Sequence, residues 1–181
     1  MSFPRKVVAG YFLSLDGVAE APDRFITAWD DETDASGARL IETQDTVVLG
    51  RRSYDEWAAF WPDSEIQPFA SFINAVPKYV ATSTPLEREW TNSRVIDGEL
   101  VDFVRRLKGE PGGDIGVHGS ISVTRTLLAA GVVDELRLVV APTIVGSGQR
   151  LFDGLPPIRL ETIRCTASAS GHLLVDYRVV N

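Results

Sequence analysis

The sequence has little cysteine, little histidine and no long apolar run. Its one cysteine, Cys165, excludes an internal disulfide and a metal site of several thiolates. We expect Cys165 to be buried or half-buried in a strand. Without carboxylate pairs at metal-binding spacing, we expect no metal site. No apolar stretch approaches the roughly 20 residues that cross a bilayer, and the first residues lack a signal peptide's apolar core, so we expect a cytoplasmic protein.

Positive charge is also scarce. Lysine and arginine number 18 against 25 aspartates and glutamates, which gives a formal net charge of −7 and a pI of about 4.8. A surface of this sign repels nucleic acid and anionic membranes, so we expect neither as a partner. An anionic cofactor can still bind where a few arginines share one cleft. Each arginine cluster is therefore a candidate site.

The 181 residues are 44% apolar, which suits one globular domain over residues 1–181. Periodicity and turn residues predict strands at 7–13, 46–49, 78–82, 94–96, 115–117, 134–141, 159–167 and 172–180. Helices are predicted at 31–43, from near Ser53 to Trp61, and at 69–76, 100–108 and 123–130. Alternation in the first two thirds predicts a mostly parallel sheet, and the closing strands predict antiparallel pairs at one edge. The fold class is α/β.

The turn after the second strand is the first candidate for binding phosphate. Gly50 lets a ligand approach the backbone, and Ser53 can cap the next helix, whose N-terminal amides attract an anion. Arg51 and Arg52 add positive charge at the same end, in a planar form that suits phosphate. The alternative is a surface turn with two solvated arginines.

A second turn of this kind runs from His118 to Ser122, and its alternative is a plain helix cap. Ligands of an open parallel sheet gather beyond the carboxyl ends of its strands, so both turns are expected to face one crevice. Neither contains the G-x-G-x-x-G dinucleotide fingerprint. Thr82 and Ser83 are a third candidate; their hydroxyls can receive a ribose phosphate or shape the turn before Pro85.

Five motifs in chain order carry a resemblance that covers about residues 5 to 180. They are Ser14-Leu15-Asp16-Gly17, Gly50-Arg51-Arg52-Ser53-Tyr54, Gly119-Ser120, Val133-Asp134-Glu135-Leu136, and Pro142 with Gly146-Ser147-Gly148 and Leu151-Phe152. Together they resemble the dihydrofolate-reductase-like fold. The resemblance is closest to the C-terminal reductase domain of the bifunctional riboflavin-biosynthesis deaminase/reductase and its stand-alone relatives. It implies a three-layer fold with a mostly parallel central sheet and antiparallel C-terminal strands.

The resemblance also implies NADPH as cofactor. Gly50 to Ser53 would meet its phosphates with Arg51 and Arg52 as anchors, and Thr82 and Ser83 would meet the adenosine 2′-phosphate. The other cofactor-binding residues it implies are Phe12 (by its backbone), Leu15, Asp16, Gly17, His118, Gly119, Ser120, Ile121 and Ser122. Residue types leave alternatives open at two of these. Asp16 can instead fix its own turn through backbone hydrogen bonds, and His118 can be a structural histidine.

Two features depart from the resembled families. The chain has no Trp-x-Leu-Pro segment of the kind usual in dihydrofolate reductases, so we do not expect folate reduction. It has no H-x-E with P-C-x-x-C zinc motif, so only the reductase half of the riboflavin enzyme is expected.

Hydride transfer to a C=N or C=O bond also needs a proton. We predict that Asp31 supplies it; the alternative is that acids at this helix start only complement the helix dipole. Trp29 and Trp61 flank loops and are candidates for a substrate pocket, because indole rings stack on flat heterocycles.

The sequence therefore predicts an NADPH-dependent reductase of a small heterocyclic substrate, pteridine- or pyrimidine-like, or of a carbonyl compound. The alternative is a non-catalytic nucleotide- or ligand-binding domain that retains the fold. The closing strands offer an edge that a partner can cover, and relatives of this kind are often homodimers, so we expect a homodimer.

Overall fold

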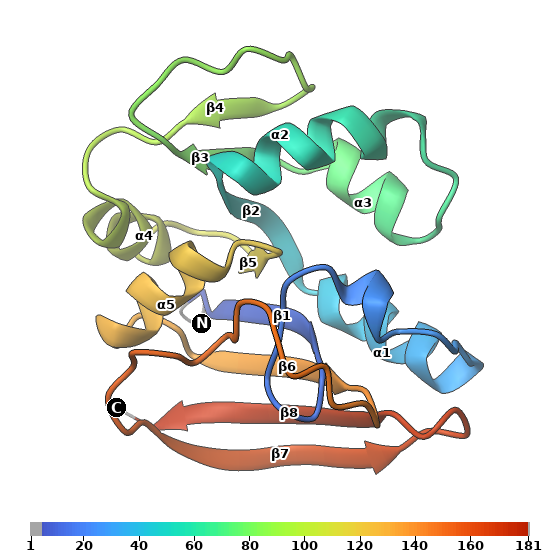
Figure 1. The fold of residues 1–181 in the computed structure, drawn as a ribbon. Coiled ribbons are helices and arrows are strands. Elements are labelled where there is room, and N and C mark those ends of the chain that lie inside the picture. The colour runs from blue at the N-terminus through green and yellow to red at the C-terminus, as the bar shows by residue number, and fades with distance from the viewer. Residues whose placement is uncertain (1–4, 181) are drawn as a thin grey trace.

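The strands of the computed structural model, which describes residues 5–180, form one eight-stranded sheet (Figure 1). They are β1 (Val7–Leu13), β2 (Gln44–Gly50), β3 (Lys78–Ala81), β4 (Ser93–Val95), β5 (Asp114–His118), β6 (Glu135–Val140), β7 (Arg159–Ala167) and β8 (Leu173–Val180). Their order is β4-β3-β2-β5-β1-β6-β8-β7. The six strands from β4 to β6 run parallel, and β8 and β7 complete the edge as antiparallel strands. The predicted sheet is confirmed.

Helices cover both faces of this sheet. They are α1 (Asp31–Ile41), α2 (Arg51–Phe60), α3 (Phe69–Ala75), α4 (Leu100–Lys108) and α5 (Ile121–Ala129), with short 3-10 turns η1 (Pro22–Arg24) and η2 (Trp61–Asp63). Side chains alternate across β2, so that Val48 packs towards α4 and α5 whereas Leu49 packs towards α2 and α3. Helix α1 lies on the same face as α3, where Leu40 covers Gly10 of β1.

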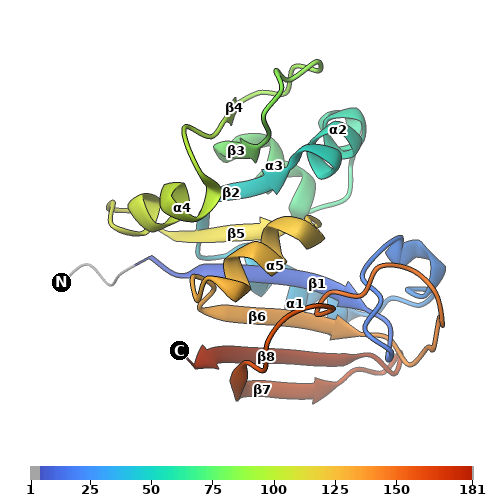
Figure 2. The ribbon, with the colours of Figure 1, turned by 60° about the vertical axis from the view of Figure 1, so that its left-hand side comes forward.

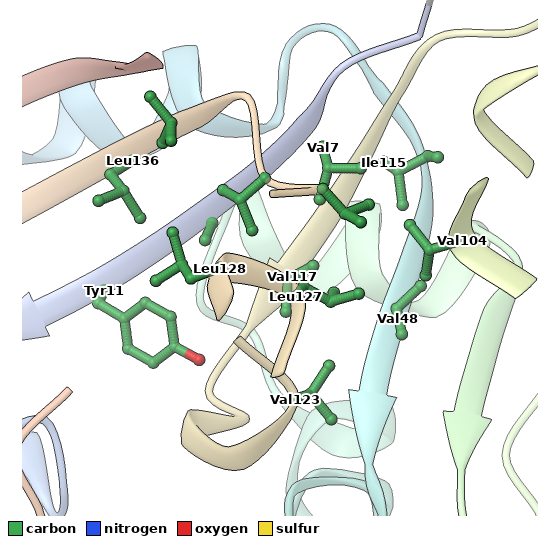
Figure 3. Close-up of a cluster of buried hydrophobic side chains, with 14 of the residues drawn as sticks. Val7, Tyr11, Val48, Val104, Ile115, Val117, Val123, Leu127, Leu128 and Leu136 are labelled. Atoms are coloured by element: carbon green, nitrogen blue, oxygen red, sulfur yellow. The ribbon is translucent and has the colours of Figure 1, made fainter. Parts of the chain in front are cut away.

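The larger core lies under α4 and α5 (Figure 3). Val48 and Val117 of the sheet meet Val104 of α4 and Leu127 of α5, and all four are fully buried. Burying each such side chain contributes roughly 1.5–3 kcal/mol. This core fixes α5 against the carboxyl half of β5, and with it the turn that joins them.

Some sequence predictions need correction. The helix after β2 begins at Arg51, with Gly50 as its N-cap, so the prediction that Ser53 caps it is wrong. The prediction that Cys165 is buried or half-buried is also wrong: it is exposed in β7, because this outermost strand pairs only with β8. Other strand and helix ends differ from the predictions by one or two residues.

Two contacts outside the sheet organise the loops. The loop after β1 is tied to the loop after β6 by the Val18–Arg150 bridge and by backbone bonds such as that from the Leu15 amide to the Thr143 carbonyl, 2.8 Å. The β7–β8 turn is tied to α1, because the Ser170 amide donates to Asp30, 2.7 Å.

Both described chain ends lie at the amino-terminal edge of the parallel strands. Arg5 precedes β1, and Val180 ends β8, which runs antiparallel to the neighbouring β6 (Figure 2). Within residues 5–180, no helix combines the length and the apolar character that crossing a bilayer requires.

Candidate functional site

The carboxyl ends of β3, β2, β5 and β1 stand in a row at one edge of the sheet (Figure 2). Parallel strands end at a common edge, and ligands of open α/β sheets collect there. The segments that follow these strands contain the predicted site residues: Thr82 after β3, Arg51 after β2, Gly119 after β5 and Leu15 after β1.

The two glycine-led turns lie side by side, as predicted. The Gly50 amide donates to the Ser120 hydroxyl, 2.8 Å, and the Ser53 hydroxyl donates to the Gly119 carbonyl, 2.9 Å. The starts of α2 and α5 are therefore joined directly. Ile121 and Ser122 form the first residues of α5, so their amides belong to this shared edge. Two neighbouring helix N-termini concentrate amide donors and positive dipole ends at one place.

Glycine is required at one of these turns. Gly119 has φ +65°, and an added Cβ would lie 2.8 Å from Cζ2 of Trp57. At Gly50 the backbone is extended, and an added Cβ would lie 3.3 Å from Val123. Of these two turns, the one at Gly119 therefore makes the closer approach, because the Trp57 ring packs directly on its backbone.

The two arginines do not point into one hollow, contrary to the idea that they reinforce a single phosphate site. Arg51 turns towards the loop after β3, where Nη1 donates to the Thr84 hydroxyl and to the Pro85 carbonyl, both 2.7 Å. Arg52 turns towards the loop after β1 and lies 3.7 Å from Glu20. They diverge because consecutive residues of a helix point in directions about 100° apart. They therefore flank the paired helix starts from opposite sides.

The loop after β3 brings hydroxyl groups to Arg51. Thr82 and Thr84 share hydrogen bonds of 3.2 to 3.3 Å, and Ser83 between them is exposed. The candidate grouping of Arg51 with Thr82 and Ser83 is thus present on one exposed surface. Asp55 and Thr84 hold the guanidinium in place before any ligand arrives.

The Asp16 side chain is engaged in hydrogen bonds within the loops after β1 and β6. Its carboxylate accepts from the Ser14 hydroxyl and from the amides of Val145 and Gly146, at 2.7 to 3.0 Å. These hydrogen bonds, that from Ser14 being the strongest, hold the pKa of Asp16 far below its usual range. This arrangement fits the alternative that Asp16 fixes its own turn. Leu15 beside it is exposed, and Gly17 has φ +83°.

The His118 side chain is buried and does not lie at the exposed strand-end edge. It is 3% exposed, its Nε2 lies 2.7 Å from the Gln44 side-chain oxygen, and its ring meets that of Phe69 edge-on. Burial lowers the pKa of His118 to about 4. The prediction that this residue contacts a cofactor is therefore wrong for its side chain, because alternation along β5 turns it towards α3.

The acidic residues at the start of α1 have different environments. Asp30 caps the helix by accepting from the Thr33 amide, 2.8 Å, and hydrogen bonds from Ser170 and Thr33 lower its pKa strongly. Asp31, the predicted proton donor, is the exposed first residue of the helix. Asp34, which sequence reasoning missed, accepts from the Trp29 indole at 2.7 Å.

Trp29 and Trp61 lie in different aromatic surroundings. Trp29 is about half exposed and stacks obliquely on Phe12 of β1, with ring centroids 5.7 Å apart. Trp61 lies among the rings of Trp57 and Phe69, at 5.9 and 4.7 Å. Phe12 and Trp29 thus place aromatic surface beside the β1 end, whereas Trp61 belongs to the wall made by α2 and α3.

Among residues 5–180, no group of three or more histidine, cysteine, aspartate or glutamate side chains is arranged to hold a metal ion. The groups that the described residues bring to this edge include backbone amides, arginines, hydroxyls, carboxylates and aromatic rings.

Two curated relatives match most of the chain. The uncharacterized protein YyaP of Bacillus subtilis strain 168 is 27% identical over 179 residues, which cover 96% of this chain and 94% of the relative. The uncharacterized protein YwjB of the same strain is 30% identical over 155 residues, which cover 83% and 84%.

Solved structures share the fold at low sequence identity. A putative riboflavin biosynthesis protein from Shewanella sp. PV-4 superposes with a TM-score of 0.77 at 19% identity, covering all of both chains. Dihydrofolate reductase from Enterococcus faecalis, complexed with NADP(H), gives 0.66 at 16% identity, also over both whole chains. The Thermotoga maritima diaminohydroxyphosphoribosylaminopyrimidine deaminase/5-amino-6-(5-phosphoribosylamino)uracil reductase gives 0.67 at 14% identity, covering 98% of this chain and 57% of that one.

These similarities confirm the dihydrofolate-reductase-like fold that the motifs predicted. The sequence model of one protein family, the RibD C-terminal domain, matches residues 5–174, from just before β1 into β8. With nearly the whole chain matched, the protein belongs to the RibD C-terminal domain family.

Proposed function

We propose that the protein is an NADPH-dependent reductase of a small heterocyclic or carbonyl substrate. The observation that carries the proposal is the direct joining of two helix starts at the strand ends, through Gly50 with Ser120 and Ser53 with Gly119. This joint supplies amide donors and positive dipole ends suited to a pyrophosphate, on a molecule whose net charge is otherwise −7.

The residues around the joint fit a dinucleotide. Gly119 has no side chain, so the Trp57 ring packs directly against the turn proposed for the pyrophosphate. Arg51, with Thr82 and Ser83, would hold the adenosine 2′-phosphate, since guanidinium and hydroxyl groups together suit a phosphate ester. Phe12 and the exposed Leu15 would border the nicotinamide at the β1 end.

A reduced nicotinamide bound there would supply a hydride to the carbon of a C=N or C=O bond, whose heteroatom must then gain a proton. Asp31 stays our predicted donor of that proton, with Asp34, three residues later in the first turn of α1, as a second carboxylate. Trp29 and Trp61 remain the candidates for contact with the substrate ring.

The test is a calorimetric titration of the protein with NADPH and NADH. We expect micromolar binding of NADPH, and we expect Arg51→Ala to weaken it about tenfold while changing NADH binding little, because only NADPH carries the 2′-phosphate. Arg178→Ala is the matched control. It removes the same charge from an exposed residue of β8, near the amino-terminal edge of the parallel strands. Absence of NADPH affinity below millimolar would refute the proposal.

The second candidate is a nucleotide- or ligand-binding domain without catalysis. It is favoured by the exposure of Asp31, because the predicted proton donor lies in open solvent and not in a site that excludes water. Cofactor binding without NADPH oxidation over a panel of pteridines, pyrimidines and carbonyl compounds would support it. In either case we propose a cytoplasmic homodimer, with β7 as the edge that a second copy covers.

A further inference from the structure

The first half of α1 is held in place by hydrogen bonds more than by apolar packing. Only two of its 11 residues are buried, and they are Thr33 near the start and Ile41 at the end. Thr33 is polar, and Gly37 between them has no side chain. A surface helix usually attaches to its domain through a buried apolar stripe. The position of this helix start therefore depends on its polar contacts.

The turn between β7 and β8 supplies these contacts. The Ser170 amide donates to one carboxylate oxygen of Asp30, 2.7 Å, and the other oxygen of Asp30 accepts from the Thr33 amide, 2.8 Å. The Ala169 amide donates to the Glu32 carboxylate, 2.8 Å. Hydrogen bonds from amides to carboxylates are charge-assisted and stronger than neutral ones. Asp30 thus caps the helix and binds the turn at the same time.

Buried side chains strengthen the same junction. The His172 ring is 1% exposed, and its Nδ1 lies 3.1 Å from the Ser170 hydroxyl and 3.4 Å from the Thr33 hydroxyl. The Thr33 hydroxyl also donates to Asp30, 2.7 Å. The turn is closed by the Ser168 amide, which donates to the His172 carbonyl, 2.8 Å. Because these groups form one connected network, the turn and the helix start are rigidly joined.

The helix start in turn holds the Trp29 side chain. The Trp29 indole N–H donates to Asp34 of α1, 2.7 Å, and its ring packs on Phe12 of β1, with centroids 5.7 Å apart. Trp29 is about half exposed, so a shift of Asp34 relative to β1 would change how its ring sits on Phe12. Contacts therefore run from the outer hairpin, through α1, to the aromatic pair beside the proposed nicotinamide position.

Resting on the proposed reductase function, we propose that Asp30 is a positioning residue of the site. By joining α1 to the β7–β8 turn, it sets the place of the adjacent Asp31 and of the Trp29–Phe12 pair. The hydrogen bonds that Asp30 accepts, that from Ser170 being the strongest, hold its pKa far below the usual range, so its carboxylate stays ionised for this role. The outer hairpin thereby contributes to the site without contact with a ligand.

The test is Asp30→Asn, which keeps the helix cap and breaks the bond to the turn. Asparagine caps helices as well as aspartate does, and its oxygen can still accept from the Thr33 amide. Its NH2 group then faces the Ser170 amide, and two donors form no bond. The protein is labelled with fluorotryptophan, and the fluorine NMR resonance of Trp29 is assigned with Trp29→Phe. We expect this resonance to shift in Asp30→Asn, and the Ser170 amide to exchange its hydrogen about tenfold faster.

The matched control is Glu42→Gln, which removes the same charge from an exposed residue at the other end of α1 and should leave both signals unchanged. An unmoved Trp29 resonance in Asp30→Asn, or the same shift in Glu42→Gln, would overturn the inference.

NADPH affinity is measured separately by calorimetry. In Asp30→Asn it should stay within about twofold of the parent value, because the proposed phosphate contacts lie on α2, α5 and the loop after β3. For a compound that the parent protein reduces, kcat/KM should fall about tenfold in this variant, since the groups on α1 are displaced. A parent protein that does not bind NADPH would instead refute the proposed function, so the two failures give different results.

Discussion

Gly119 is the residue at which the two helix starts come into contact. Alanine there must adopt φ +65° and place its Cβ 2.8 Å from the rigid Trp57 ring. We expect Gly119→Ala to lower the free energy of unfolding by about 2 kcal/mol or more and to weaken NADPH binding. Urea unfolding and calorimetry measure the two effects.

The matched comparison is Gly50→Ala on the other turn. Its backbone is extended and its added Cβ would meet Val123 at 3.3 Å, so its cost should stay below about 1 kcal/mol. If the two variants were equally stable, the close approach at Gly119 would not be the constraint described above.

His118 makes stability depend on pH. Its pKa is about 4 in the folded protein and 6.5 in the unfolded chain, so below pH 6.5 the unfolded state binds the extra proton. The free energy of unfolding should therefore fall between pH 6.5 and pH 4, by about 3 kcal/mol in total from this residue. Carboxyl groups with lowered pKa, such as Asp16 and Asp30, lose their contribution only at lower pH.

Urea unfolding at several pH values between 4 and 7 tests this. His118→Asn should be less stable than the parent at pH 7, because it disturbs the bond to Gln44, but its stability should change less across the window. An unchanged pH dependence in the variant would contradict the assignment to His118.

At the scale of elements, the ion pair between Arg52 and Glu20 joins α2 to the loop after β1. This pair competes with any phosphate for Arg52. On the proposed function, Glu20→Gln should raise NADPH affinity about threefold, since Arg52 becomes freer while the amide can still accept from the Gln149 backbone. Glu161→Gln on β7 is the control, because it removes the same negative charge far from Arg52. Equal NADPH affinities in both variants would show that the change in net charge, and not the loss of this ion pair, alters the affinity.

The elements themselves were predictable because local signals agreed with the fold. β1 was placed correctly by its run of β-branched and aromatic residues, and α4 by its apolar face. The helix after β2 was predicted to begin near Ser53 because serine is a strong cap signal. In the structure that hydroxyl serves another turn, at Gly119, and no local pattern contains a contact 66 residues away.

The site was predictable only as far as backbone positions. Parallel order brings the turns at Gly50 and Gly119 together, and chain order alone indicated this. The directions of the side chains could not be predicted from chain order. In the structure Arg51 and Arg52 diverge, and the His118 side chain turns inwards. Asp34 could have been found from its place three residues after Asp31, on a similar side of the helix.

For the whole molecule, the proposed homodimer rests on the outer hairpin. β7 has one strand neighbour, and Ile163 and Leu173 of the hairpin are 47% and 41% exposed. We expect sedimentation to show a dimer that Ile163→Glu dissociates, because an unpaired charge in a covered interface is costly. Ile144→Glu, at an exposed apolar residue in the loop after β6, should leave the dimer intact. A monomeric parent protein from about 1 to 100 μM would remove the proposal.

The placement of Arg5 and Val180 at the amino-terminal edge has a practical consequence. Anything fused near either position, whether an affinity tag, a reporter or a tether to a solid support, would be held some distance from the strand carboxyl ends, where we propose that ligands bind. Immobilised protein should therefore take up small molecules as freely as protein in solution, which suits surface-based screening of substrates.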